Sequence, residues 1–168
     1  MTLAFSTELN KKPTYFVEKI LTSLVKEKLI EVMPFAKLAL EYYNKFNLDH
    51  DKAPAVYPKI HTIRVDEHDR WKEGMLIHFV INNRTPNRYQ FAPVLKCVST
   101  QKIKIHYWYN AKNEAFDIPS VYLDGEEINE TLINEIAIND GFDSTYGFFR
   151  YFNTDFSGKI IHWTNKKY

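Results

Sequence analysis

The sequence predicts an α+β protein in which helices flank a curved, barrel-like sheet of about six mostly antiparallel strands. Three observations support this fold class. Apolar residues recur at helical spacing in the first third of the chain, and short β-branched and aromatic runs follow residue 61. Helical patterns return after residue 128 and are followed by a last strand-like run. The expected order is therefore two helices, a run of strands, two helices and one strand.

The N-terminal third predicts two amphipathic helices. Phe16, Ile20 and Leu24 keep a four-residue spacing that places them on one face, and Pro13 suits the first turn of this helix. A second helix is expected from Pro34. Its buried side would carry Phe35, Leu38, Ala39, Tyr42, Tyr43 and Phe46.

The strands are expected where apolar and polar residues alternate. The clearest case is the segment 102–110, in which Ile103 and Ile105 alternate with Lys102 and Lys104. The other predicted strands are HTIRV (61–65), MLIHFVIN (75–82), YQFAPVLKCVST (89–100), the start of SVYLDGEEI (120–128) and KIIHWT (159–164). Within the segment 120–128, the Asp-Gly pair predicts a tight turn.

Capping residues mark the two later helices. Asn129 is expected to cap a helix that carries Leu132, Ile133, Ile136 and Ala137, and Gly141 would end it. Asp143 or Ser144 would cap the next helix, which carries Phe148, Phe149, Tyr151 and Phe152.

Length and composition predict a single domain, residues 1–168. The single cysteine, with no visible signal peptide, predicts a cytoplasmic location. The only cysteine, Cys97, excludes an intramolecular disulfide and a cysteine-based metal cluster. The pair His61 and His68 lacks supporting ligands, so no metal site and no cofactor are expected. No signal peptide and no apolar run long enough to cross a membrane are present, which predicts no membrane partner.

Charge is unevenly distributed although the net charge is only +1. Residues 74–113 contain no Asp or Glu, and residues 114–158 are strongly acidic. One interpretation is that the two segments face each other across the fold. The other is that the basic segment contacts phosphate groups of a nucleic acid.

A lysine, a threonine and an arginine lie within six residues, at positions 59, 62 and 64. Because side chains alternate along a strand, Thr62 and Arg64 are expected on one face and Ile63 on the other. Lys59 would join the Thr62 face only if the chain turns after Pro58. This stretch is thus a candidate wall of a cleft.

The same stretch resembles the ASCH domain, a family within the PUA-like superfamily of small β-barrels. The residues that carry the resemblance are Lys59-Ile60-His61-Thr62-Ile63-Arg64, the charged turn Arg70-Trp71-Lys72-Glu73-Gly74 and the strand that follows it. Further similar segments are Ala4-Phe5-Ser6, Phe16–Leu21, Asn139–Ser144 and Lys159–Trp163. Residues 22–56 would then be a helical insertion.

The resemblance implies binding of RNA, a nucleoside or a nucleotide in a basic cleft beside the barrel. From the residues themselves, Arg64 could hold a phosphate, and Trp71, an aromatic beside Arg70 and Lys72, could stack a base, so these four are the candidate ligand-binding residues. The alternatives are a packed Trp71 and a solvated turn at Arg70 and Lys72. An alternative is hydrolysis of acetylated cytidine or a similar small amide, because the sequence is partly similar to a branch of the family that comprises small bacterial amidohydrolases of acetylcytidine nucleosides. Thr62 would then be the nucleophile and Lys59 the base, and Asp140, where the family has glutamate, would orient the lysine or relay a proton. A third alternative is a structural or interaction protein that binds a protein partner through its N-terminal helices.

Overall fold

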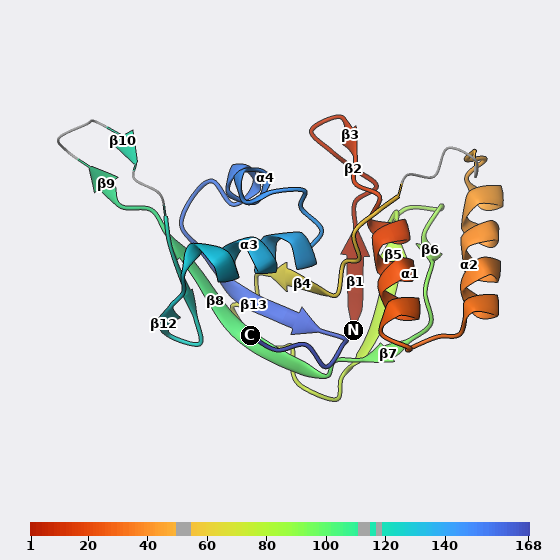
Figure 1. Ribbon diagram of the computed structural model, residues 1–168. Coiled ribbons are helices and arrows are strands. Elements are labelled where there is room, and N and C mark those ends of the chain that lie inside the picture. Colours follow the sequence, from red (N-terminus) through yellow and green to blue (C-terminus); the bar gives the residue numbers. More distant parts are fainter. Residues whose placement is uncertain (50–54, 111–114, 117–118) are drawn as a thin grey trace. The chain divides into compact units, whose positions relative to one another are not determined.

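The computed structural model describes residues 1–49, 55–110, 115–116 and 119–168. Over these residues the chain forms four helices and several β-sheets (Figure 1). The chain divides into two compact units. Unit 1 comprises Met1–Ile60 and Met75–Lys96, and unit 2 comprises His61–Gly74 and Cys97–Tyr168.

The sheet of unit 1 is built around β5 (Leu76–Ile81). β1 (Thr2–Phe5) pairs with it in parallel, with Phe5 opposite Ile81, whereas β6 (Tyr89–Gln90) and β7 (Leu95–Lys96) pair with it antiparallel. A short hairpin follows β1 and consists of β2 (Glu8–Leu9) and β3 (Lys12–Pro13). Aromatic rings fill the core beside β5. The centre of the Phe5 ring lies 6.2 Å from that of Phe79 and 5.9 Å from that of Phe91.

Two helices complete unit 1. α1 (Phe16–Lys26) buries Ile20 and Leu24 completely, as its four-residue spacing predicted. Pro13 lies in β3 rather than in the first turn of α1, so that part of the prediction was wrong. α2 (Val32–Lys45) buries Tyr42 and Tyr43 and begins two residues before the expected start. Residues 50–54, at the end of the predicted insertion, lie outside the described residues.

Unit 2 contains a five-stranded antiparallel sheet. Its strands, in spatial order, are β12 (Glu126–Glu127), β11 (Ser120–Leu123), β8 (Ser99–His106), β13 (Phe156–His162) and β4 (His61–Arg64). A separate two-stranded ladder consists of β9 (Tyr109–Asn110) and β10 (Ala115–Phe116). The predicted alternation in β8 is confirmed, since Ile103 and Ile105 are buried and Lys102 and Lys104 are exposed.

Two helices cover one face of this sheet (Figure 1). α3 (Glu130–Asn139) begins at the predicted cap, where the Asn129 side chain accepts a hydrogen bond from the Leu132 backbone N–H at 2.9 Å. α4 (Thr145–Tyr151) is capped by Ser144, whose hydroxyl accepts from the Gly147 N–H at 3.2 Å. Between them, Gly141 has φ +93°, which allows the backbone to leave α3.

The prediction of a PUA-like β-barrel was wrong, although the α+β class is correct. A barrel requires the two edge strands of a sheet to hydrogen-bond to each other. Among the described residues, β12 and β4 are the edges of the five-stranded sheet and do not pair with each other. The outward backbone N–H of Ile63 in β4 donates instead to a side chain, the carboxylate of Asp140.

Candidate functional site

The predicted cleft residues lie on and around β4. Ile63 faces the core of unit 2, opposite Ile160 of β13, and is 4% exposed. Thr62, opposite Ile161, is buried as well, and Arg64 at the end of the strand is half-buried. Because both faces of β4 are covered up to residue 63, only the end of the strand at Arg64 is accessible to a ligand.

Two of the three proposed catalytic residues belong to unit 2. Thr62 is 2% exposed, and Asp140 is 5% exposed at the C-terminal end of α3. The Asp140 Oδ1 atom lies 3.0 Å from the Ile63 nitrogen, one residue along β4 from Thr62. Asp140 is therefore held at β4 and has a structural role there.

Lys59, the third proposed catalytic residue, belongs to unit 1 and is only 1% exposed. Its ammonium lies 5.0 Å from the centre of the Phe16 ring and 6.0 Å from that of Phe5. Its backbone N–H donates to the carbonyl of Lys19 at 3.0 Å. Aromatic faces are attractive to cations, so these rings stabilise the buried lysine.

The charged turn after β4 is organised by Asp66. Its carboxylate accepts backbone hydrogen bonds from Arg70 and Trp71, both at 2.9 Å, and lies 3.3 Å from the Lys159 ammonium. Lys159 also pairs with Asp69 and donates to the Trp71 carbonyl at 2.8 Å. Although burial raises the pKa of Asp66, these backbone donors and Lys159 more than compensate, and its pKa is lowered overall.

The packing and ion pairs of this turn limit which of the other predicted ligand-binding residues can contact a ligand. The ring of Trp71 is 5% exposed, so it is packed and offers little surface on which a base could stack. Lys72 pairs with Asp69, whereas Arg70 is exposed. Of the predicted ligand-binding residues, Arg64 lines a pocket in unit 2.

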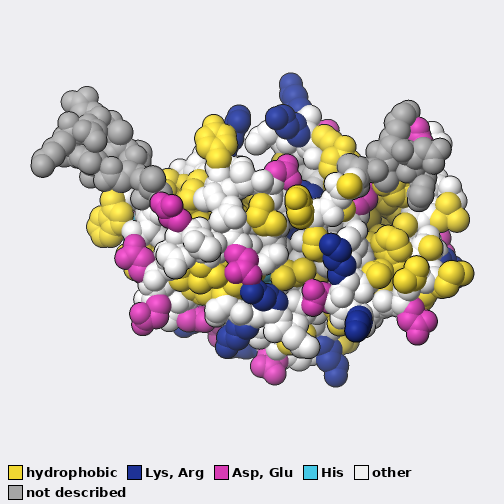
Figure 2. Space-filling model, viewed as in Figure 1, with side chains coloured by type: hydrophobic (Ala, Val, Ile, Leu, Met, Phe, Trp, Pro, Cys, Tyr) yellow, Lys and Arg dark blue, Asp and Glu magenta, His cyan; other side chains and the backbone are white. Residues whose placement is uncertain are grey.

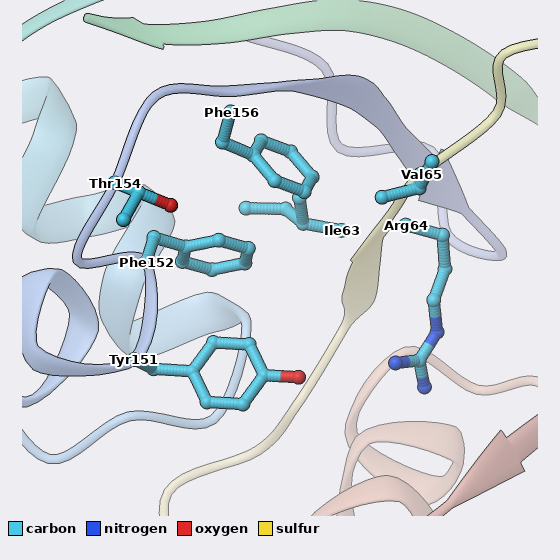
Figure 3. Close-up of a pocket in the computed structure, with 7 residues that line it drawn as sticks. All are labelled: Ile63, Arg64, Val65, Tyr151, Phe152, Thr154 and Phe156. Carbon is cyan, nitrogen blue, oxygen red and sulfur yellow. The ribbon is translucent and has the colours of Figure 1, made fainter.

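That pocket is an open hollow of about 480 Å³ within unit 2. It lies where the end of β4, the end of α4 and the start of β13 meet, and it is lined by Ile63, Arg64, Val65, Tyr151, Phe152, Thr154 and Phe156. Figure 3 shows the floor formed by the side chains of Ile63, Phe152 and Phe156. The phenol of Tyr151 and the guanidinium of Arg64 extend along one edge of the pocket.

The floor of the pocket is rigidly supported. Phe152 and Phe156 pack edge to face, with ring centres 4.7 Å apart. The Tyr107 hydroxyl donates to the carbonyl of Phe152 at 2.6 Å, which fixes the end of α4 relative to β8. Of the described residues that line the pocket, none carries a carboxylate, and Arg64 brings the one formal charge. The pocket therefore suits a flat apolar ring that carries an anionic group.

Tyr151, Thr154 and Phe156 were missed as site residues by the sequence analysis. The signal available for them was limited: the predicted helix ends near Tyr151, and residues that follow a helix end often line binding sites. Their convergence on β4 depends on the pairing of β13 with β4, which joins residues about 100 positions apart (Ile160 and Ile63).

The basic and acidic segments meet within unit 2. β8, from the acid-free segment, lies between β11 and β13 of the acidic segment. The Lys102 backbone N–H donates to Asp124, and His106 and the Tyr107 N–H bind the two carboxylate oxygens of Asp155. This agrees with the interpretation that the segments face each other. Figure 2 likewise shows basic and acidic side chains interspersed on the face in view.

Histidines and acidic residues of the described part form no group of three or more that could hold a metal ion. His61 and His162 lie side by side on β4 and β13, with ring centres 5.4 Å apart. His61 Nδ1 is 3.1 Å from the Tyr168 hydroxyl, which also accepts from the Asn139 amide at 2.8 Å. This pair belongs to the buried core of unit 2.

The α2 helix displays apolar side chains on its surface, among them Val32 at 65%, Met33 at 78% and Leu40 at 53% exposure. This is the region for which a protein partner was predicted, and that partner stays a prediction. None of the helices in the described ranges has the length and apolar character that a membrane span requires.

Comparisons with known proteins found no match among protein-family models, curated proteins or solved structures. The resemblance to the ASCH domain accordingly stays a prediction.

Proposed function

We propose that unit 2 binds a nucleotide, free or as one unit of an RNA chain, in the pocket at the end of β4. The observation that carries the proposal is the combination of an aromatic floor with a single guanidinium and no carboxylate in the described lining. A pocket of about 480 Å³ falls within the size range of small-ligand sites, roughly 300–1,000 Å³. The resemblance to ASCH domains, which implies nucleic-acid or nucleoside ligands, supports the same assignment.

The base would lie against the aromatic side chains. Tyr151 is 47% exposed, so much of its ring is accessible to a stacked base. Phe152 and Phe156 would contact the edge of the base from below, and the Thr154 hydroxyl would supply a hydrogen bond. Stacking on an aromatic side chain contributes about 1–3 kcal/mol per base.

The phosphate would bind Arg64. A guanidinium presents two parallel N–H groups that match two phosphate oxygens, and such charge-assisted contacts are among the stronger hydrogen bonds. Because the net charge of the protein is only +1 and the surface charges are mixed, we expect one or two phosphate contacts. The salt dependence of binding should therefore be shallow, with a slope of log K against log salt of about −1 to −2.

The test is a titration of nucleoside monophosphates and short RNAs, followed by thermal shift and calorimetry. Arg64→Gln should weaken nucleotide binding by roughly 10-fold or more while leaving nucleoside binding little changed, since charge-assisted contacts contribute about 1.5–3 kcal/mol. Tyr151→Leu should weaken both by about 5-fold or more, because stacking is lost. Lys104→Gln removes the same charge from an exposed position of β8 in unit 2, outside the pocket, and is the matched control.

Equal affinity of the wild-type protein and both pocket variants for every nucleotide would refute the proposal. A uniform loss in Arg64→Gln and Lys104→Gln would show that binding depends on overall charge rather than on the pocket.

Hydrolysis of acetylated cytidine is the second candidate function. It rests on the resemblance alone, and the burial of Thr62 argues against it, because a nucleophile must be reached by its substrate. The assay is release of cytidine from acetylcytidine. Loss of release in Thr62→Ala, with unchanged melting temperature, would support Thr62 as the nucleophile, and release that persists in this variant would exclude it.

A further inference from the structure

A second cavity lies wholly within unit 1. It has a volume of about 160 Å³ and is bordered by the end of the β2–β3 hairpin, the first turn of α1 and the C-terminal half of α2. Its lining includes the aromatic residues Tyr15, Phe16 and Tyr42 and one acidic residue, Glu18. Three aromatic residues and a carboxylate around a small space form the arrangement from which cation-binding cages are built.

Tyr15, which lines this cavity, has a backbone conformation that tyrosine rarely adopts. Tyr15 precedes α1 with φ 54° and ψ 29°, the left-handed region that a bulky residue rarely adopts. It is fixed by its neighbour Thr14, whose hydroxyl donates to the Ser6 carbonyl at 2.7 Å and whose N–H donates to the Thr7 carbonyl at 3.0 Å. Backbone conformations of this kind persist where the surroundings enforce them, often at ligand sites.

Glu18 gives the cavity a negative potential. Its Oε1 atom accepts a hydrogen bond from the Tyr43 hydroxyl at 3.1 Å. Burial raises the pKa of Tyr42 to about 12, and the negative charge of Glu18 contributes to the shift. The Glu18 carboxylate therefore also acts on the Tyr42 hydroxyl. The N–H groups of the first turn of α1 favour an anion, and Glu18, in that turn, already provides one.

We propose that the unit 1 cavity binds the trimethylammonium group of a small quaternary ammonium compound, with its charge between Glu18 and the rings of Tyr15 and Tyr42. The size fits, because an apolar cavity of about 150 Å³ is large enough for a benzene ring. A quaternary nitrogen has no N–H groups, so it needs aromatic rings and a counter-charge rather than hydrogen-bond acceptors. The lining contains aromatic residues and a carboxylate.

Other ligand classes fit the lining less well. Glu18 would repel an anion. A primary ammonium is strongly hydrated and needs several oxygen acceptors, whereas the cavity is lined mainly by rings and apolar side chains such as Val17 and Leu48. The Lys59 ammonium lies against Phe16 but does not line the cavity, so the bound charge would be nearest to Tyr15 and Tyr42.

The discriminating experiment compares choline with 3,3-dimethylbutan-1-ol, in which a neutral carbon replaces the quaternary nitrogen. We expect the intact protein to bind choline at least fivefold more tightly by calorimetry or protein-observed NMR. Trimethyl-lysine is the third ligand, and its affinity relative to choline distinguishes a modified protein tail from a free small molecule as the source of the group. Equal binding of choline and its neutral analogue, or no binding of either cation, overturns the proposal.

Three variants locate the site. Glu18→Gln keeps an oxygen that can accept from Tyr43 and should weaken choline binding at least fivefold without changing the binding of the neutral analogue. Tyr15→Leu removes one ring and should weaken choline binding to a similar extent. Glu8→Gln removes the same charge from exposed β2, outside the cavity, and should bind choline like the wild type. If both cavity variants retain wild-type affinity at a wild-type melting temperature, the site is excluded. Because the cavity lies in unit 1, this result is independent of nucleotide binding by unit 2.

Discussion

The carboxylate of Asp140, at the C-terminal end of α3, accepts a hydrogen bond from the backbone N–H of Ile63 in β4 at 3.0 Å. β4 is the edge of the five-stranded sheet, and an edge strand leaves backbone N–H groups without a ladder partner. The Asp140 carboxylate therefore supplies one hydrogen bond to β4 that a neighbouring strand would otherwise supply.

Asp140→Ala should lower the free energy of unfolding by about 1–3 kcal/mol, because a buried N–H loses its acceptor. Asp140→Asn keeps a side-chain oxygen and should cost less than half as much. Urea unfolding measures both, with Glu126→Ala on exposed β12 as the control. Equal stability of the alanine variant and the wild type would show that this bond does not stabilise β4.

Lys159 is a second residue on which unit 2 depends. It is 7% exposed and pairs with Asp66 and Asp69. Lys159→Met should cost about 3–5 kcal/mol, because it leaves the buried Asp66 carboxylate without its counter-charge. The loss should be smaller in the double variant Lys159→Met/Asp66→Asn, and a double-mutant cycle from urea unfolding measures the coupling. Additive losses would contradict a direct interaction.

The pH dependence of stability should reflect His162. Burial lowers the pKa of His162 to about 4, from an ordinary value of about 6.5. Lys167 lowers it further, and Asp124 opposes the shift. Below pH 6.5 the unfolded chain therefore binds a proton that the folded protein does not accept until about pH 4, so stability should fall by about 3 kcal/mol as the pH decreases through this window.

His162→Leu should remove this component. Among the described residues neither ring nitrogen of His162 has a hydrogen-bond partner, so an apolar side chain of similar size should be tolerated. Carboxylates such as Asp66 titrate in an overlapping range, and the measurement is therefore the difference in unfolding free energy between variant and wild type at pH 7 and at pH 4.5. A difference that is the same at both pH values would refute the role of His162.

Gly158 of β13 lies close to two residues that line the pocket, Arg64 and Phe156. A Cβ atom at this position would lie 2.4 Å from the Arg64 carbonyl oxygen and 2.7 Å from Cζ of Phe156. Because the Arg64 contact is with backbone, Gly158→Ala should destabilise the protein by about 1–3 kcal/mol. It should also weaken any ligand of the pocket, since both displaced residues line it.

Gly147→Ala is the matched control for Gly158→Ala. There the nearest atom to a new Cβ is the Ser144 hydroxyl, at an ordinary contact distance of 3.6 Å. Thermal unfolding and nucleotide titration of the two variants should separate them clearly. Identical stability of both glycine variants would mean that β13 can move away from β4 at little cost.

Local features of the fold were predictable from the sequence. The Asn129 cap, the Ser144 cap, the Asp124–Gly125 turn and the alternation of β8 each depend on residues within a few positions of one another. Such signals act through hydrogen bonds and side-chain direction in a single element, so the order of residues contains them.

The wrong prediction of a closed β-barrel also has a physical explanation. The sequence indicates which segments are strands, but closure depends on which edge strands pair, and these lie far apart along the chain. The parallel pairing of β1 with β5, which joins Leu3 to Phe79, has no local signal. Likewise, the burial of Trp71 depends on its tertiary surroundings, and an aromatic beside basic residues could as well have been exposed.

The sequence by itself thus determined the α+β class, most helices and strands, and Arg64 as a candidate ligand residue at the end of β4. Only the tertiary structure decided that Asp140 bonds to the edge of β4, that Lys159 neutralises Asp66, and that Tyr151 and Phe156 join Arg64 around one pocket. The physical reason is that these contacts join residues that are distant in sequence. Their positions are set by the packing of whole helices against sheets, which no short pattern of residues encodes.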